Sequence, residues 1–267
     1  MNYISKTAKI STTAIIRDGV TIEDDVVVGD NSYLDYGCVL RSGVTLGEGS
    51  YVGPYCILGE FQMDFHQKHT VQKIHPLQIG KGALIRSHSI LYGGSVFEEG
   101  LQTGHHVTIR EETKAGKHLR IGTLTDIQGH CIIGDYVNMH SNVHIGMHTK
   151  IGNYVWIFPY CVFTNDPIPP SEITCGCTIG DYSIIATGTI LLPGVNMGEN
   201  SFVGAGGIVT KNIPENMFAV GCPAKIKGCV NQIKNPETGE VAYPWPNRFD
   251  RYMPWQGIGF EEWKNQQ

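Results

Sequence analysis

An apolar residue recurs at every sixth position over most of this chain. The frame runs from Ile4 to Leu58, restarts from Ile79 to Phe163, and resumes from Ile179 to Val209, and Thr103 is its only polar member. A chain in which 41% of residues are hydrophobic would not keep such a frame by chance. A fixed period is the signature of a repeat architecture, so it decides the fold before any other feature.

A period of six matches neither an α-helix nor a simple alternating strand, and it fits a short flat segment followed by a turn. Three such segments close one triangular coil, with the apolar residue pointing inward. The residue two places earlier is small in many repeats, which lets a narrow prism fill without overpacking. These small residues are Ala8, Ala14, Ser32, Cys38, Ser50, Cys56, Ala83, Ser89, Ser95, Cys131, Cys161, Ser183 and Ser201. Glycine often follows the apolar residue, as in Gly29 and Gly47, and we expect it to supply a turn with positive φ.

The repeats amount to about ten stacked coils. We therefore expect an all-β fold in which residues 1–230 form one elongated domain. Residues 231–267 lack the repeat and are rich in aromatic side chains, so we expect an extension that packs on the outside of the prism, with a short helix at "FEEWKN".

Composition excludes several classes of protein. The net charge of −5 argues against a general nucleic-acid binder. The chain enters the repeat at once and shows neither a signal peptide nor a membrane span, so we expect a cytoplasmic protein with no membrane insertion. Five of the eight cysteines occupy the small inward position, which predicts buried thiols in a reducing compartment. Cys175 and Cys177 form only a C-x-C pair, so no metal site is expected.

Function is expected where the repeat fails, because a regular prism has no pocket. The frame is interrupted at 59–78 and at 164–178, the second interruption being a proline-rich arm. It ends in "KNIPENMFAVGCPAKIKG" after Val209. Thr103 marks a further local constraint, since it is a polar residue at a core position.

Polar side chains are concentrated in the middle coils. "LQTGHHVTIREET" carries His105, Arg110 and Glu111, and "GTLTDIQGHCIIGDYVNMHSNVHIG" carries a second group. That second group comprises Asp126, Gln128, His130, His140 and Asn142. Residues one coil apart stack directly, as His106, Leu124 and Asn142 do, so these groups should line neighbouring corners of the prism.

"IGDYVN" (133–138) and "IGNYVW" (151–156) resemble the motif of the hexapeptide-repeat transferases. The resemblance implies a left-handed parallel β-helix and a homotrimer with active sites between neighbouring prisms. The ending of the repeat is similar to that of many hexapeptide acyltransferases, which bind the pantetheine arm of coenzyme A or of an acyl carrier protein. The contacts that it implies are Ala186, Gly188, Gly204, Ala205, Lys211, Pro223, Ala224 and Lys225.

"QTGHHVTIREET", "IGTLTDIQ", "YVNMHSNVHIG" and "VWIFPYCVFTNDPIPP" resemble the N-acetyltransferases of dTDP-linked 3-amino-3,6-dideoxyhexoses, which serve surface polysaccharide synthesis such as that of O-antigen and lipopolysaccharide. The resemblance implies acetyl-CoA as acyl donor and a nucleotide-linked amino sugar as partner. It also implies sugar contacts from His105, Arg110, Glu111, Asp126 and Gln128, and catalytic roles for His130, His140 and Asn142.

Two mechanisms are compatible with that resemblance. A histidine can deprotonate the sugar amine, but related enzymes carry this histidine one place earlier than His130, where this chain has Gly129. In the other mechanism a neutral amine attacks the thioester directly and positioning supplies the rate, which we favour. Backbone N–H groups would then stabilise the oxyanion.

Other functions fit parts of the pattern. A UDP-linked amino-sugar N-acetyltransferase or an O-acetyltransferase would use the same fold. A γ-type carbonic anhydrase needs an H-x4-H pair, which this chain does not contain. A non-catalytic scaffold would need neither the polar middle coils nor the acyltransferase-like ending.

Overall fold

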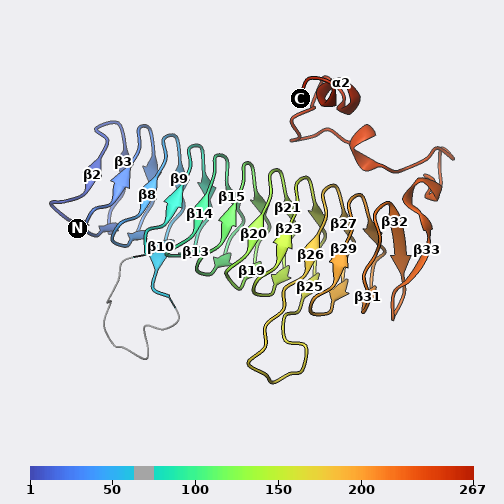
Figure 1. Cartoon of the computed structure of the whole chain (residues 1–267). Helices are drawn as coiled ribbons and strands as arrows, with labels where there is room; N and C mark the ends of the chain where they lie inside the picture. Colours follow the sequence, from blue (N-terminus) through green and yellow to red (C-terminus); the bar gives the residue numbers. More distant parts are fainter. Residues whose placement is uncertain (63–74) are drawn as a thin grey trace.

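The computed structural model shows a long triangular prism with a C-terminal extension along one side, and it describes residues 1–62 and 75–267 (Figure 1). Within these residues the strands form three parallel sheets, here called sheets A, B and C, which contain 11, 10 and 12 strands. Successive strands belong to successive sheets, so each turn of the chain adds one strand to every face. The predicted all-β, left-handed parallel β-helix is confirmed, with about 11 coils where about ten were expected.

Most strands are two residues long. Sheet A contains β1 (Tyr3–Ile4), β4 (Thr21–Ile22), β7 (Val39–Leu40), β10 (Ile57–Glu60), β13 (Ile90–Tyr92), β16 (Thr108–Ile109), β19 (Asp126–Ile127), β22 (His144–Ile145), β25 (Val162–Phe163), β28 (Ile190–Leu191) and β31 (Ile208–Val209). Sheet B contains β2 (Lys9–Ile10), β5 (Val27–Val28), β8 (Thr45–Leu46), β11 (Gln78–Ile79), β14 (Val96–Phe97), β17 (Lys114–Ala115), β20 (Ile132–Ile133), β23 (Lys150–Ile151), β26 (Thr178–Ile179) and β29 (Asn196–Met197). Sheet C contains β3 (Ile15–Ile16), β6 (Tyr33–Leu34), β9 (Tyr51–Val52), β12 (Leu84–Ile85), β15 (Gln102–Thr103), β18 (Arg120–Ile121), β21 (Asn138–Met139), β24 (Trp156–Ile157), β27 (Ile184–Ile185), β30 (Phe202–Val203), β32 (Met217–Val220) and β33 (Lys225–Cys229).

The core lies inside the prism and consists of the residues that the period selected. The second residue of each strand from β1 to β31 is the member of the six-residue frame, and these side chains form one continuous buried cluster from Ile22 to Val209. The small residue two places earlier is also buried, as Cys38 and Ser183 are. Ile4 is 44% exposed because β1 is an edge strand of sheet A. The five inward cysteines are buried free thiols, and burial raises the pKa of Cys38 to about 11.

The turns between strands contain a residue with positive φ, but it is not at the position that the sequence suggested. Gly29 and Gly47, directly after inward residues, do not have positive φ, so that expectation was wrong. A Cβ on Gly29 would lie 2.5 Å from the backbone nitrogen of Glu48, which shows that the next coil passes too close for a side chain. Positive φ occurs two residues later in the repeat, where His88, His118 and His148 stand, so these histidines are turn residues.

The last coil is built from the segment after the repeat. Ile213 bridges to Met197 in sheet B, and β32 adds to sheet C beside β30. β33 then pairs antiparallel with β32 and forms the end of sheet C. The ending motif therefore closes the prism, which explains the additional coil.

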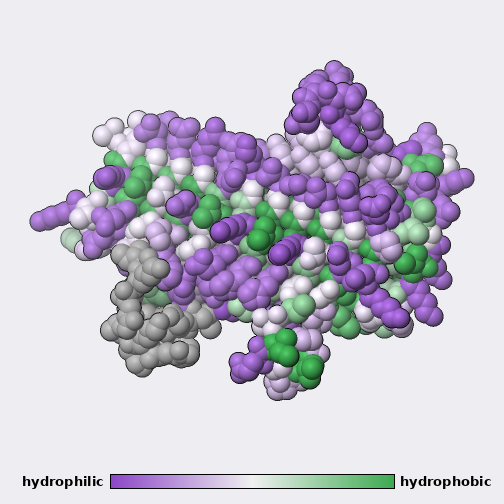
Figure 2. Space-filling view, viewed as in Figure 1, coloured by the Kyte–Doolittle hydropathy of each residue, from purple (hydrophilic) through white to green (hydrophobic). Residues whose placement is uncertain are grey.

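Both interruptions of the repeat fall between a strand of sheet A and the next strand of sheet B. The 59–78 interruption follows β10, and its His66 and His69 lie outside the described residues. The 164–178 arm leaves after β25 and projects away from the prism, on the side opposite to the C-terminal helix in Figure 1. Ile168 and Ile173 on this arm are 68% and 55% exposed, and Figure 2 shows hydrophobic atoms at its tip.

The C-terminal extension packs aromatic side chains against the prism. Trp245, Met253 and Trp255 form a buried cluster with Ile184 of sheet C. The Nε1 atom of Trp245 donates a hydrogen bond to the carbonyl of Tyr182 at 2.9 Å. The elements of this segment are η1 (Val230–Gln232), η2 (Trp245–Asn247) and α2 (Phe260–Lys264), the last of which is the predicted short helix. The outer surface of the C-terminal extension is hydrophilic in Figure 2. The division of the chain into domains at residue 230 stays a prediction.

Candidate functional site

Most of the predicted site residues lie at the edges of the prism. These three edges are here called corners AB, BC and CA after the sheets that each chain turn connects. At corner CA, His105 follows β15, and His140 and Asn142 follow β21. Ala186 and Gly188 follow β27, and Gly204 and Ala205 follow β30, so they lie on the same corner near the end of the prism. Corner CA therefore joins two predicted catalytic residues to half of the predicted cofactor contacts.

Corner CA changes character along its length. The residue with positive φ has a side chain in the middle coils, where Leu124, Asn142 and Tyr160 succeed one another. In the next two coils it is glycine, at Gly188 and Gly206, and a Cβ added to either would meet nothing within 4 Å. Internal packing does not require glycine there, since Tyr160 accepts a φ of 62° at the equivalent position. The two glycines leave the backbone uncovered on the outside of the corner.

His140 lies among aromatic side chains. Its ring stacks on Phe158 with the centroids 4.9 Å apart and lies 6.4 Å from the ring of Trp156. His140 is exposed to solvent, but desolvation by its neighbours still lowers the pKa of His140 below the ordinary value of 6.5. The ring is therefore neutral at neutral pH and can accept a hydrogen bond or a proton.

A pocket of about 410 Å³ lies beside corner CA, between sheet C and the C-terminal extension. Its floor comes from Gln102, Arg120 and Asn138 on successive strands of sheet C, and its corner side includes His105 and His140. Arg251 and Tyr252 of the extension complete the wall. Figure 1 shows the extension running back along the prism from β33.

A hydrogen bond of the Thr103 hydroxyl explains why the repeat carries a polar residue at the pocket. The side chain of Thr103 is 2% exposed, and its hydroxyl accepts a hydrogen bond from the backbone N–H of Arg86 at 3.1 Å. In other coils a carbonyl accepts the equivalent bond, as that of Ile121 does from Gly104. The polar core position therefore alters the backbone at Arg86, which lines the same pocket.

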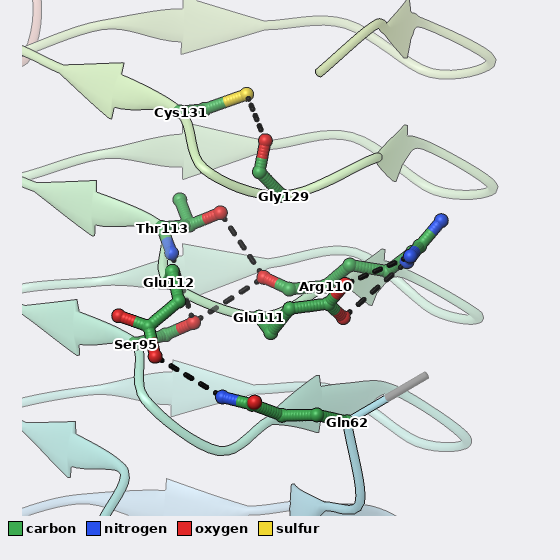
Figure 3. A network of polar contacts seen from close by, with 8 residues as sticks. All are labelled: Gln62, Ser95, Arg110, Glu111, Glu112, Thr113, Gly129 and Cys131. Atoms are coloured by element: carbon green, nitrogen blue, oxygen red, sulfur yellow. Dashed lines mark hydrogen bonds and ion pairs between the residues drawn. The ribbon is translucent and has the colours of Figure 1, made fainter. Parts of the chain in front are cut away.

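The other predicted residues lie on corner AB or near it. Arg110 donates to Glu111 at 2.8 Å, and Glu111 is only 6% exposed (Figure 3). His130 stacks on His148 in the next coil with the centroids 5.3 Å apart. Gln128 succeeds Arg110 one coil later, between the two interruptions of the repeat. Within one chain, corner AB is separated from corner CA by the full width of sheet A.

Asp126 and His144 lie on sheet A itself. They are paired residues of β19 and β22, and Nδ1 of His144 is 3.1 Å from Oδ2 of Asp126, which confirms the predicted stacking. The outward residues before and after them in the same column are mostly aliphatic: Val39, Ile57, Ile90, Val162, Ile190 and Ile208. Sheet A is thus a largely apolar face with one polar pair at its centre.

The remaining predicted cofactor contacts lie at the closed end of the prism. The backbone N–H of Ala224 donates to the carbonyl of Ile208 at 2.8 Å, which fixes Pro223 and Ala224 beside the last strand of sheet A. Lys211 and Lys225 are exposed. Both ammonium groups are available to an anionic ligand.

Sequence reasoning missed Arg86, Arg120, Arg251 and Tyr252 because they come from three separate segments and no spacing connects them. Thr103 was the one signal, since it marked the coil at which the pocket forms. Among the residues that the structure describes, no group of three or more His, Cys, Asp or Glu side chains is arranged to hold a metal. The described chain also contains no helix with the length and hydropathy needed to cross a bilayer.

Comparison with known proteins finds similarity between part of the repeat and one family. The family model for bacterial transferase hexapeptides (six repeats) matches residues 25–60. A galactoside O-acetyltransferase of Lactococcus lactis subsp. lactis (strain IL1403) is 31% identical over 124 residues, which is 43% of this chain and 55% of that protein. The bifunctional protein GlmU of Clostridium botulinum (strain ATCC 19397 / Type A) is 27% identical over 208 residues, 78% of this chain and 40% of that protein. The chain spans about half or less of the length of these curated relatives.

Solved structures superpose only loosely. LpxA, a UDP-N-acetylglucosamine acyltransferase from Bacteroides fragilis 9343, has a TM-score of 0.41 and 18% identity, with 85% of this chain and 72% of that chain covered. PerB from Caulobacter crescentus, solved with CoA and GDP-perosamine, has a TM-score of 0.24 and 15% identity, with 85% and 57% covered. Together, the six-residue repeat, the three-sheet prism that it builds and the match over residues 25–60 make this chain similar to the hexapeptide-repeat transferases.

Proposed function

We propose that the protein transfers an acetyl group from acetyl-CoA to the amino group of a nucleotide-linked amino sugar. The observation that carries the proposal is the continuity of corner CA. His140 and Asn142 stand on the same edge as the uncovered glycines 188 and 206, and the pocket opens beside them. A dTDP-linked 3-amino-3,6-dideoxyhexose is the substrate that the sequence resemblance favours, and a UDP-linked amino sugar is the alternative.

The acyl donor would lie along corner CA. Gly188 is two coils beyond Asn142, which is about 10 Å at the usual spacing of about 4.8 Å between strands. An extended pantetheine arm can run over uncovered backbone at Gly206 and Gly188 and present its thioester near Asn142. Its amides would pair with backbone groups, and the exposed Lys211 and Lys225 would meet the phosphates of coenzyme A.

The chemical step needs little from side chains. A neutral amine attacks the thioester carbonyl, a C–N bond forms, the C–S bond breaks, and the departing thiolate takes the proton. Holding both reactants in line supplies most of the rate, because it replaces a bimolecular encounter. His140 and Asn142 would orient the amine and the carbonyl. His130 lies on the opposite edge of sheet A, beside His148, so it could reach the same reactants only from a neighbouring subunit.

A homotrimer packed through sheet A would bring the two edges together. In a closed ring of three subunits, each seam combines different edges of two neighbours. Corner AB, with Arg110, Gln128 and His130, would then face corner CA of the next subunit. The apolar outer column of sheet A and the exposed isoleucines 168 and 173 of the arm would supply contact surface.

This assembly predicts a sharp difference between two isoleucines that each begin a strand. Ile190→Glu places a carboxylate on the outer column of sheet A, and we expect monomers by analytical ultracentrifugation together with loss of activity. Ile132→Glu changes the equivalent position on sheet B, which is 53% exposed, and should leave the trimer and its activity intact. An active Ile190→Glu monomer would exclude a shared site.

The activity itself is tested by offering acetyl-CoA with dTDP- and UDP-linked amino sugars and following release of free thiol. We expect turnover with an amine-bearing sugar and none with the matching hydroxyl sugar. O-acetylation is a second candidate, because a relative is a galactoside O-acetyltransferase. An ester product is cleaved by hydroxylamine and an amide is not, so treatment of the product separates the two reactions. Absence of thiol release with every sugar would refute the proposal.

A further inference from the structure

The pocket between sheet C and the C-terminal extension is strongly basic in an acidic chain. Arg86, Arg120 and Arg251 line it together with His105 and His140, and no aspartate or glutamate of the described residues does. The chain as a whole has 25 acidic and 20 basic residues, so this composition is not that of the average surface. Its volume of about 410 Å³ falls in the range of about 300–1,000 Å³ typical of small-molecule sites.

The three pocket arginines also differ from the other four in their partners. Arg41, Arg110 and Arg248 each form an ion pair with a glutamate at 2.8–3.0 Å. Arg17 donates a hydrogen bond to the hydroxyl of Tyr36. None of the pocket arginines forms an ion pair with a residue in the described ranges 1–62 and 75–267.

Two of these arginines are held in place by neutral groups. The guanidinium of Arg120 lies over the ring of Tyr252, 3.8 Å from its centroid. The backbone N–H of Arg86 is bonded to the Thr103 hydroxyl. Gathering like charges costs free energy unless an anion compensates them, and the guanidinium fork matches the geometry of phosphate oxygens.

We propose that this pocket binds a nucleoside diphosphate, with Arg86, Arg120 and Arg251 on its phosphates and the ring of Tyr252 beside its base. The inference rests on the proposed function, because both substrates of that reaction contain this group. The amino sugar is carried on a nucleoside diphosphate, and coenzyme A contains a phosphorylated adenosine diphosphate. The extension thereby acquires a role that the repeat cannot supply, namely one wall of a substrate pocket.

The experiment is isothermal titration calorimetry of the whole chain with dTDP, UDP and coenzyme A in separate titrations. None of these ligands carries an acyl group, so binding is measured without acyl transfer. Arg86→Ala and Arg251→Ala are the test variants. Arg248→Ala is the matched control, since Arg248 lies in the same extension but pairs with Glu240 outside the pocket. Each test variant should weaken binding of one nucleotide class by roughly 10- to 100-fold, as expected for a charged hydrogen bond that is lost. Arg248→Ala should change it less than about twofold.

The arms distinguish the two sources of the diphosphate. A loss confined to dTDP and UDP assigns the pocket to the sugar substrate, and a loss confined to coenzyme A assigns it to the acyl donor. Equal affinities in wild type, Arg86→Ala and Arg251→Ala for all three ligands would overturn the inference, with circular dichroism confirming that the variants are folded. Arginine-dependent binding without acetyl transfer would refute the proposed function alone. Acetyl transfer with KM values unaffected by either substitution would refute the pocket alone.

Discussion

Corners BC and CA have the same backbone and opposite surroundings. At corner BC the positive-φ position carries His118, Tyr136, Tyr154 and Tyr182, whose rings stack at 4.7–5.6 Å in a continuous ladder. The extension covers that ladder, and Trp255 lies 5.2 Å from Tyr154. At corner CA the same position ends in bare glycines at 188 and 206. One repeat therefore provides a structural edge and an open edge, and the side chains at the positive-φ turn position are one difference between them.

The largest predicted effect is on stability and comes from removing a buried side chain at corner BC, which the extension covers. Trp255 is fully buried among Tyr154, Trp245 and Phe260, and its Nε1 donates to the carbonyl of Phe249 at 3.0 Å. We expect Trp255→Ala to lower the free energy of unfolding by about 3–5 kcal/mol, the range for a buried tryptophan replaced by alanine. Denaturant titration followed by circular dichroism measures it.

The open corner supplies the control for that loss. Leu124 at corner CA is 58% exposed, so Leu124→Ala should change stability by less than about 0.5 kcal/mol. Equal losses for the two substitutions would show that corner BC is no more structural than corner CA.

A second prediction concerns a side chain placed on the open edge, corner CA. Gly188→Tyr recreates at the next coil the side chain that Tyr160 already presents, and we expect it to raise KM for the acyl donor at least about tenfold by occupying the pantetheine path. Gly82→Tyr makes the same change at corner BC, where φ is +67° and an added Cβ also meets nothing within 4 Å. Both variants carry the same backbone cost of about 1–2 kcal/mol. A rise in KM that is equal in both would trace the effect to strain and would remove the proposed path.

The smallest predicted effect concerns His140. For direct attack by the amine, His140→Ala should lower kcat less than about tenfold, whereas loss of a general base costs about 10² or more. Burial lowers the pKa of His140, so this ring is half-protonated only at a pH below 6.5. The midpoint of any acidic limb that belongs to His140 must therefore lie below that pH, and the limb must vanish in His140→Ala. A drop of 10² or more together with loss of that limb would make His140 the base.

Burial also shifts pKa values at corner BC, where it raises that of Tyr154 far above the working range. No change in activity between pH 5 and 9 should come from the three tyrosines of that ladder, because burial raises the pKa of each. Titration of the histidine ring signals by NMR reports His140 directly and separates it from the pH dependence of the sugar amine.

The sequence predicted most of the prism because the repeat is local. Each frame residue, such as Ile133 or Ile151, has to point inward to be buried, and its neighbours in space are its equivalents one coil away. The register is therefore contained in the period itself. The additional coil was missed because Ile213 follows Val209 by four residues rather than six, so the frame was no longer recognisable. The role of Gly29 was misjudged because close approach of another coil is a tertiary fact that no local rule contains.

The candidate site was predicted less completely. His105 and His140 were found because polar side chains stood out against the repeat, and the structure places both at one pocket. Arg251 and Tyr252 could not be found, since they reach sheet C only after the chain has turned back along the prism. Whether His130 and Arg110 join His140 depends on assembly, because the two corners never meet within one chain.

The sequence by itself determined a three-sided tube, its core and the coils in which the polar residues lie, because a repeat that buries one residue in six fixes each contact by its distance along the chain. Only the tertiary structure decided which corner is covered and where three arginines gather. Those contacts join segments that no period relates, since they depend on the path of an extension whose aromatic side chains have to find a surface on which to be buried.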